Sequence, residues 1–261
     1  MSEGTLLVSF GTTFQKTREN SIGKIAEELT KALPGRPLYQ AYTSNIVRKV
    51  LKERDGIEIP DVEGALYKAR EDGVRKLTIL PTHIIDGVEN NRMKETIRSR
   101  KNDFEEIRLA GPLLAEPEDY RKVSEALYRE LGERIGGGTI IFMGHGSSHA
   151  SDRCYPVMEE ALRERFGSHA YIATVEGSVT LDDVLPRTRE NPAPSRRVLV
   201  TPFMLVAGDH ANNDMAGKDA RSFASRLRAE GYTVECLIKG LGEYDSIREI
   251  YFEHARRAKK L

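Results

Sequence analysis

The chain has 261 residues, of which 39% are hydrophobic and 31% are charged. This length can form one large α/β domain or two smaller ones. Forty basic residues balance forty acidic ones, so the net charge gives no case for nucleic acid or an acidic membrane surface as a partner. The two cysteines, Cys154 and Cys236, are not spaced as CxxC, which argues against a disulfide scaffold and against a structural zinc or iron–sulfur site.

Neither a targeting segment nor a membrane span is expected. The opening Met-Ser-Glu-Gly leads straight into a short apolar run, without the basic region and long apolar stretch of a signal peptide. No run approaches the roughly 18 apolar residues of a membrane helix. We therefore expect a cytoplasmic location.

Strands and helices alternate along the first half of the chain. Apolar runs predict strands, and apolar residues at helical spacing predict helices. The expected strands are 5–10, 38–42, 74–81 and 107–110, and the expected helices are 22–33, 46–51, 61–73, 90–101 and 117–134. This alternation is typical of βαβ units and parallel sheets.

The second half repeats the same rhythm after Gly136-Gly137-Gly138, the best candidate for a break between domains. The expected strands are 139–143, 170–175, 197–202 and 232–238, and the expected helices are 151–166, 180–190, 212–230 and 244–258. We predict an α/β fold of two Rossmann-like lobes, residues 1–135 and 136–261, each a parallel sheet flanked by helices.

The two halves also resemble each other in sequence. A gap-free comparison of residues 6–13 with 141–148 places Phe10 on His145, and comparison of residues 81–89 with 202–210 places Glu89 on His210. This repeat predicts lobes related by approximate two-fold symmetry with a cleft between them. A cleft at a domain interface is a common place for a small-molecule site.

His145 is the first candidate functional residue. It lies between two glycines at the end of the buried strand 139–143, where a ligand binds in open α/β sheets. The alternative is a structural histidine whose hydrogen bonds are all made within the turn. His210 follows the strand 197–202 at the same edge, although it could instead cap a helix. Glu176, after the strand 170–175, alone would be a solvated strand end. Together the three form a 2-His-1-carboxylate set, which suits divalent first-row metals and leaves coordination positions open.

His83 and Glu89 come from the matching loop of the first half and are expected to face the second-lobe residues across the cleft. A glutamate at a helix start is also common for dipole reasons alone. His149 is expected at a helix start, and the charged stretch 92–106 is expected to be a solvated helix face.

The sequence resembles the anaerobic cobaltochelatases of the CbiK type, within the class II tetrapyrrole chelatases. The resemblance covers essentially the whole chain. It is carried by segments 7–12, 43–49, 54–57, 83–87, 142–146, 175–176 and 240–243, and most specifically by Met-Leu-Val-Ala-Gly-Asp-His at 204–210. One small departure is Gly-Ser-Ser-His at 146–149, where the family has Gly-Ala-Ser-His.

The resemblance implies insertion of Co²⁺ into sirohydrochlorin, an early step of anaerobic cobalamin (vitamin B12) biosynthesis. His145 would be the proton acceptor and a metal ligand, with Glu176 and His210 as the other ligands. Phe10, Met143 and the 84–85 loop would line the walls that hold the macrocycle, alongside His83 and Glu89. No cofactor is expected beyond the substrate metal, and the lack of a P-loop disfavours an ATP-driven chelatase.

Other functions are also compatible with the sequence. The ligand set does not separate Co²⁺ from Fe²⁺, or from Ni²⁺ in vitro, so sirohydrochlorin ferrochelatase activity is an alternative. A non-catalytic tetrapyrrole or metal carrier is another. A periplasmic-type binding protein would need a signal peptide, and a phosphohydrolase would need arginines near His145. The sequence leaves open whether the chain forms a homo-oligomer.

Overall fold

The computed structural model describes residues 2–261, and its contacts divide the chain into two compact units. The first comprises Met1–Ala115 and Arg248–Leu261, and the second comprises Glu116–Ile247. This division differs from the expected boundary at 135/136 in two respects. The helix that precedes the glycine triplet belongs to the second unit, and the end of the chain returns to the first.

The first unit contains a five-stranded sheet. Its elements are β1 (Glu3–Ser9), α1 (Gln15–Arg18), the π-helical segment η1 (Glu19–Gly23), α2 (Lys24–Ala32), β2 (Leu38–Tyr42), α3 (Asn45–Asp55), α4 (Val62–Glu71), β3 (Lys76–Pro81), α5 (Val88–Ser99), the 3-10 turn η2 (Lys101–Asp103), β4 (Glu106–Leu109) and the short β9 (Lys259–Lys260). The strand order is β2-β1-β3-β4-β9. All pairings are parallel except that of β9 with β4.

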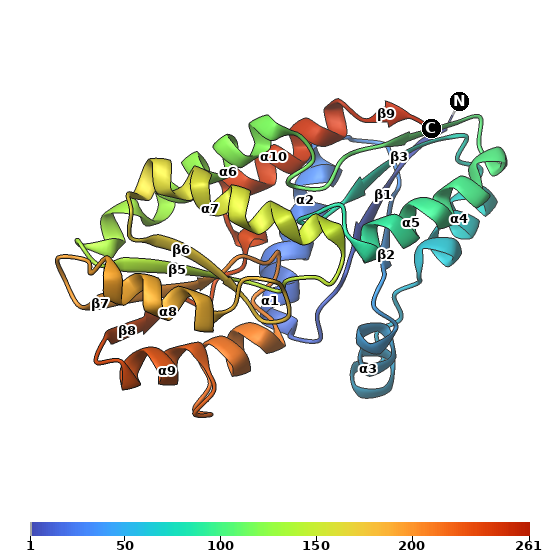
Figure 1. Ribbon diagram of the computed structural model, residues 1–261. Helices are drawn as coiled ribbons and strands as arrows, with labels where there is room; N and C mark the ends of the chain where they lie inside the picture. The colour runs from blue at the N-terminus through green and yellow to red at the C-terminus, as the bar shows by residue number, and fades with distance from the viewer. Residues whose placement is uncertain (1) are drawn as a thin grey trace. The chain divides into compact units, whose positions relative to one another are not determined.

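Helices cover both faces of this sheet. Figure 1 shows α2 on one side of β1 and α4 and α5 on the other. Leu6 and Val8 of β1 share a buried cluster with α4 and α5 residues such as Leu66 and Met93. Alternate side chains of a strand point to opposite faces, so the intervening Leu7, which is also buried, faces the opposite side. Burial on both faces explains the nearly continuous apolar runs of these strands.

The second unit contains a four-stranded parallel sheet in the order β6-β5-β7-β8. Its elements are α6 (Pro117–Leu131), the 3-10 turn η3 (Gly132–Ile135), β5 (Thr139–Gly144), the 3-10 turn η4 (Ala150–Arg153), α7 (Cys154–Phe166), β6 (Ala170–Thr174), α8 (Leu181–Glu190), β7 (Arg197–Pro202), the π-helical segment η5 (Ala211–Met215), α9 (Phe223–Ala229), β8 (Thr233–Cys236) and the 3-10 turn η6 (Leu241–Glu243). Helix α10 (Asp245–Arg256) leads back to the first unit.

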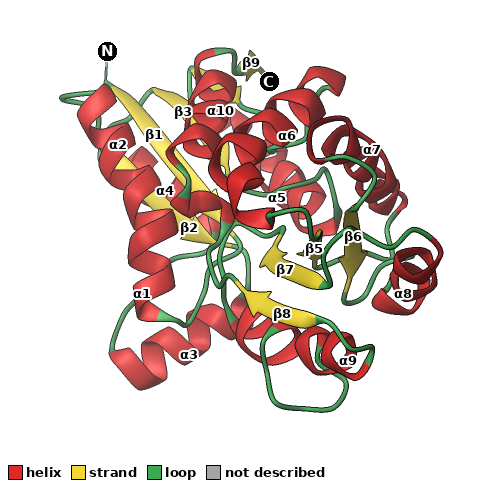
Figure 2. Ribbon diagram, turned by 90° about the vertical axis from the view of Figure 1, so that its left-hand side faces the viewer, coloured by secondary structure: helices red, strands yellow, loops and turns green. Residues whose placement is uncertain are grey.

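β5 lies at the centre of this unit's core. Ile141 and Met143 share a buried cluster with residues of α8 and α9, while Phe142 makes an edge-on contact with Phe166 at the end of α7. Figure 2 shows β7 and β8 side by side with α9 next to β8. Both faces of β5 are therefore covered, and its six residues are all buried.

The register of the strands confirms the internal repeat. Val8 pairs with Pro81 in the first sheet, and Met143 pairs with Pro202 in the second. The next residue donates the same bond in each case: the N–H of Thr82 to the carbonyl of Val8, and the N–H of Phe203 to the carbonyl of Met143. In chain order both sheets place their first four strands as 2-1-3-4. The gap-free comparison of the two halves therefore matches equivalent backbone positions.

Two sequence predictions need correction in detail. The helix expected at 212–230 is two elements, η5 and α9, because the chain turns at Gly217 and restarts where the Ser222 hydroxyl accepts the N–H of Ser225. The strand β9 was not expected, and it adds an antiparallel edge to the first sheet. The strands predicted in the two halves are otherwise present within one or two residues at most ends.

Contacts of the final helix explain why the chain's end belongs to the first unit. The buried Arg248 makes a bidentate ion pair with Glu28, with N–O distances of 2.7 and 2.9 Å. The Tyr251 hydroxyl donates to the carbonyl of Thr82 at 2.9 Å. Within residues 2–261, no helix combines the length and apolar character needed to cross a bilayer.

Candidate active site

The three residues predicted as metal ligands all lie at the carboxyl edge of the second unit's sheet. His145 follows β5, Glu176 follows β6, and His210 precedes η5 in the loop after β7. The imidazole rings of His145 and His210 are nearly perpendicular, and their centroids are 4.8 Å apart. A Glu176 carboxylate oxygen is 4.0 Å from Nδ1 of His145. Residues far apart in the chain thus come together because parallel strands end at one edge.

Hydrogen bonds define which nitrogen each imidazole can offer. Nδ1 of His210 is 2.6 Å from a carboxylate oxygen of Asp214, and Nδ1 of His145 is 3.1 Å from the carbonyl of Gly146. A carboxylate and a carbonyl oxygen can only accept, so both contacts favour the tautomer with the proton on Nδ1. That tautomer leaves the Nε2 lone pair of each ring for a metal ion or a proton.

The three side chains do not yet form a closed coordination sphere. Among the described residues, no group of three or more His, Cys, Asp and Glu side chains is arranged so that it could hold a metal ion as it stands. The side chain of Glu176 is 63% exposed and that of His145 is 45% exposed, which leaves room for both to reorient. The three side chains lie next to one another without enclosing an ion, unlike the four fixed ligands of a structural metal site.

Glycines bring the loops that carry His145 and Glu176 into direct backbone contact. Gly146 has φ of +86°, and a Cβ there would lie 2.2 Å from the backbone nitrogen of Gly177. The N–H of Glu176 donates to the carbonyl of His145 at 2.8 Å. The Gly146 N–H donates to the Tyr155 hydroxyl at 3.2 Å, and burial raises the pKa of that phenol. Glycine at position 146 is therefore required by both conformation and space.

Met143 does not contribute to the binding surface that the sequence suggested. Its side chain is fully buried in the cluster formed by β5, α8 and α9. Alternate residues of a strand face the same side of the sheet, so Met143 points with Ile141 into the core between β5, α8 and α9. Met143 therefore supports the site from the core and is not available to a substrate.

The remaining candidates, Phe10, His83 and Glu89, belong to the first unit. Phe10 follows β1 and is 47% exposed, and Glu89 lies in the first turn of α5, 3.2 Å from Arg92. Both ring nitrogens of His83 are buried and lack a hydrogen bond of good geometry. Burial lowers the pKa of His83 to about 4, and the nearby Asn90 and Asp86 offset only part of that effect. His83 is thus neutral near pH 7.

Two carboxylates near the site, Asp214 and Asp152, were not predicted from the sequence. Asp214 lies four residues after His210, a spacing that places two side chains on one face of a helical segment, and this was the signal available. Asp152 accepts hydrogen bonds from the loops after β5 and β6, and no sequence spacing indicates those contacts. His149 lies at a helix start as expected: it is the N-cap of η4, with Nδ1 accepting the N–H of Ser151.

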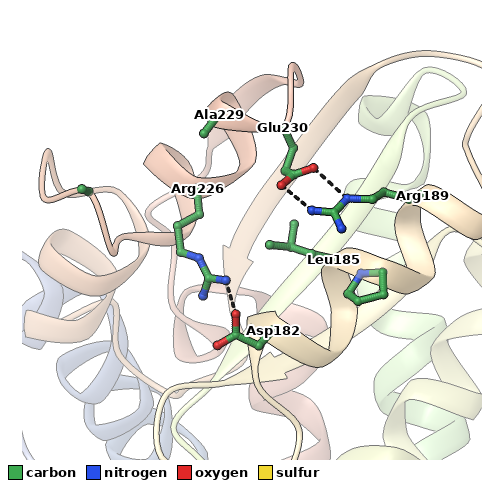
Figure 3. A pocket seen from close by; sticks show the side chains of 8 residues that line it. Asp182, Leu185, Arg189, Arg226, Ala229 and Glu230 are labelled. Atoms are coloured by element: carbon green, nitrogen blue, oxygen red, sulfur yellow. Dashed lines mark hydrogen bonds and ion pairs between the residues drawn. The ribbon is translucent and has the colours of Figure 1, made fainter.

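A separate hollow of about 300 Å³ lies between α8 and α9 (Figure 3). Its charged side chains are paired with each other: Arg226 contacts Asp182, and Arg189 lies 2.8 Å from Glu230. None of the predicted site residues lines it. Because these charges are already compensated, this hollow offers no charged group for a ligand.

Comparison with known proteins identifies the family. Residues 3–260 match the family model described as cobalt chelatase (CbiK). The chain is 32% identical over 259 residues to a sirohydrochlorin cobaltochelatase of Salmonella typhimurium, covering 99% of this chain and 97% of the relative. It is 31% identical over 263 residues to the sirohydrochlorin cobaltochelatase CbiKC of Nitratidesulfovibrio vulgaris, covering 98% and 90%. The chain belongs to the CbiK family of cobalt chelatases.

Solved structures agree on the fold. SirB from Bacillus subtilis with Fe³⁺ superposes with a TM-score of 0.69 at 12% identity, covering 98% of this chain and 95% of that one. CbiX, the terminal enzyme for biosynthesis of siroheme in denitrifying bacteria, gives a TM-score of 0.59 at 16% identity, covering 98% of this chain and 99% of that one. At these identities the likeness concerns the fold alone.

Proposed function

We propose that this chain inserts Co²⁺ into sirohydrochlorin without ATP, as a step of anaerobic cobalamin biosynthesis. Both the metal ion and the tetrapyrrole are substrates, and no further cofactor takes part. The family membership supports the activity. The observation that carries the site is the pair of imidazoles 4.8 Å apart, both held by their Nδ1 contacts with Nε2 available, next to Glu176. Action in the cytoplasm is part of the proposal, and cell fractionation tests it.

The ligand set explains how the ion is held before insertion. Nε2 of His145 and of His210 coordinates Co²⁺, and Glu176 turns toward the ion from its exposed position at the end of β6. Three protein ligands leave coordination positions into which the pyrrole nitrogens enter as water leaves. The Asp214 carboxylate fixes the orientation of the His210 ring, as a carboxylate behind a metal-binding histidine commonly does.

Insertion also requires that two pyrrole protons leave the macrocycle. Imidazole is the side chain whose ordinary titration range lies closest to neutral pH, which suits a general base. We assign this role to His145, because its ring is exposed at the sheet edge and its Nε2 lone pair is not engaged by the Gly146 contact. His145 then serves as ligand first and accepts one proton at Nε2 when the ion moves to the ring. The second proton passes to a carboxylate of the site, such as Glu176.

The macrocycle is proposed to contact Phe10, His83 and Glu89 of the first unit. Phe10 offers an exposed aromatic face, the kind of surface on which a flat macrocycle packs. His83 is neutral, and because its ring nitrogens are buried, its contact with the macrocycle would be made through the ring carbons without adding charge. Met143 is left out of this set because it is fully buried.

The experiment mixes the purified protein anaerobically with sirohydrochlorin and Co²⁺, and follows the visible spectrum with enzyme at a small fraction of the substrate concentration. We expect many turnovers with the native chain and a loss of turnover in His145→Ala and His210→Ala. His169→Ala is the control, since His169 lies before β6 and outside the site. A parallel series with Fe²⁺ and Ni²⁺ measures metal preference.

Three results would contradict this function. Product formation that stops at one equivalent of protein would indicate a carrier, and unchanged rates in both histidine variants would remove the site from the reaction. Faster turnover with Fe²⁺ than with Co²⁺ would indicate a ferrochelatase that uses the same residues.

A further inference from the structure

A single buried carboxylate connects the loops that carry His145 and Glu176. Asp152, which is 6% exposed, lies in the 3-10 turn η4. Its Oδ1 accepts the N–H of Ser147 at 2.8 Å. Its Oδ2 accepts both the N–H and the hydroxyl of Ser178, at 2.8 and 2.6 Å. One side chain therefore ties the residue two positions after His145 to the residue two positions after Glu176.

The two loops pack closely around this carboxylate. A Cβ on Gly177 would lie 2.5 Å from Oδ1 of Asp152, and a Cβ on Gly146 would lie 2.2 Å from the nitrogen of Gly177. Asp152 itself is held by its N–H, which donates to the carbonyl of His149 at 2.9 Å. The backbone of the His145 loop, the Asp152 carboxylate and the backbone of the Glu176 loop are thus closely packed. A shift of one loop must therefore move the other.

We propose that Asp152 is a positioning residue that sets the separation of His145 and Glu176 and thereby the affinity of the site for Co²⁺. This inference rests on the ligand set of the proposed function. The three donors that converge on Asp152 require two accepting oxygens. An asparagine has only one, so Asp152→Asn leaves at least one buried donor without a partner. The loops then separate, and the two ligands with them.

The chain provides a control with nearly the same contacts. Oδ2 of Asp183, at the start of α8, accepts both the N–H and the hydroxyl of Thr180, at 2.8 and 2.9 Å, at the end of the loop that carries Glu176. Because one oxygen makes both contacts, Asp183→Asn can keep them with its amide oxygen and removes only the charge. Both substitutions therefore remove one negative charge at the Glu176 loop, but only the change at Asp152 leaves a donor without a partner and alters the metal site.

The test measures binding of Co²⁺ alone by calorimetry and by the visible absorption of the bound ion, together with circular dichroism for folding. We expect Asp152→Asn to raise the Kd by roughly 10–100-fold, the range typical of lost outer contacts, and to shift the absorption bands. Asp183→Asn leaves both unchanged. Ser178→Ala removes one of the three donors and gives a smaller increase in Kd, which serves as the decisive variant if Asp152→Asn does not fold.

Equal Kd values for the native chain, Asp152→Asn and Ser178→Ala would overturn the inference. His145→Ala separates this failure from that of the proposed function. If His145→Ala weakens Co²⁺ binding while Asp152→Asn and Ser178→Ala do not, only the role of Asp152 is wrong. If His145→Ala binds Co²⁺ as the native chain does, the ligand set itself is wrong and the role of Asp152 falls with it.

Discussion

Phe10 and His145 occupy equivalent backbone positions in the two units. The N–H of Ser44 donates to the carbonyl of Phe10 at 3.3 Å, and the N–H of Glu176 donates to the carbonyl of His145 at 2.8 Å. Ser44 is thereby equivalent to Glu176, and the sequence repeat aligns Glu89 with His210. The edge that carries two histidines and a glutamate in the second unit carries a phenylalanine, a serine and a glutamate in the first.

This difference predicts a division of labour that Phe10→Ala can test. Phenylalanine cannot bind a metal ion, so we expect Co²⁺ binding to be unchanged. Loss of an aromatic contact worth about 1–2 kcal/mol raises the KM for sirohydrochlorin by roughly tenfold. Steady-state kinetics and Co²⁺ titration measure the two effects, and Phe10→Tyr retains the ring as a control. An unchanged KM would remove Phe10 from the substrate surface.

Asp214→Asn tests how much the orientation of His210 matters. Replacing the carboxylate that contacts Nδ1 of His210 with a neutral amide should weaken Co²⁺ binding by roughly 10–100-fold. Asn213→Ala is the matched variant, because it removes a neighbouring contact of the same spacing, from Asn213 to Asp209 at 2.8 Å. Calorimetric titration with Co²⁺ compares them. Identical affinities in the two variants would show that Asp214 has no special role.

Gly146→Ala tests the contact between the two ligand loops. Alanine at positive φ costs about 1–2 kcal/mol, and the forced movement of Gly177 adds about 1–3 kcal/mol of overpacking. Gly137→Ala isolates the first cost, because Gly137 also has positive φ but a Cβ there would meet nothing within 4 Å. Denaturant unfolding should show the larger loss for Gly146→Ala, together with weaker Co²⁺ binding. Equal losses would indicate that the loops can separate freely.

His83 predicts a specific pH dependence of stability. Burial lowers the pKa of His83 to about 4 in the folded chain, whereas an unfolded histidine titrates near 6.5. The unfolded state therefore binds more protons between these values, and stability falls as the pH drops from 7 toward 4. The expected loss by pH 5 is about 2 kcal/mol. Denaturant midpoints at pH 7 and pH 5 measure it, and His83→Gln should lack this part of the loss. The same pH dependence in both chains would contradict the assignment.

Several features of this protein were determined by the sequence alone. Apolar runs identified the strands because parallel strands buried on both faces must be continuously apolar. The positions of His145, Glu176 and His210 after three such strands predicted that they would meet at one sheet edge, because parallel strands end together. The matched prolines, Pro81 and Pro202, indicated a repeat that the register of both sheets confirms.

Other features were decided only by tertiary structure. The sequence could not show that Met143 is enclosed by α8 and α9. An apolar residue near the end of a strand can face either the core or the binding edge, and the packing of the helices decides which. It could not join Asp152 to Ser178, 26 residues away, nor return β9 to β4 across most of the chain. Local patterns record the periodicity of each element, whereas these contacts depend on how elements distant in the chain pack against one another.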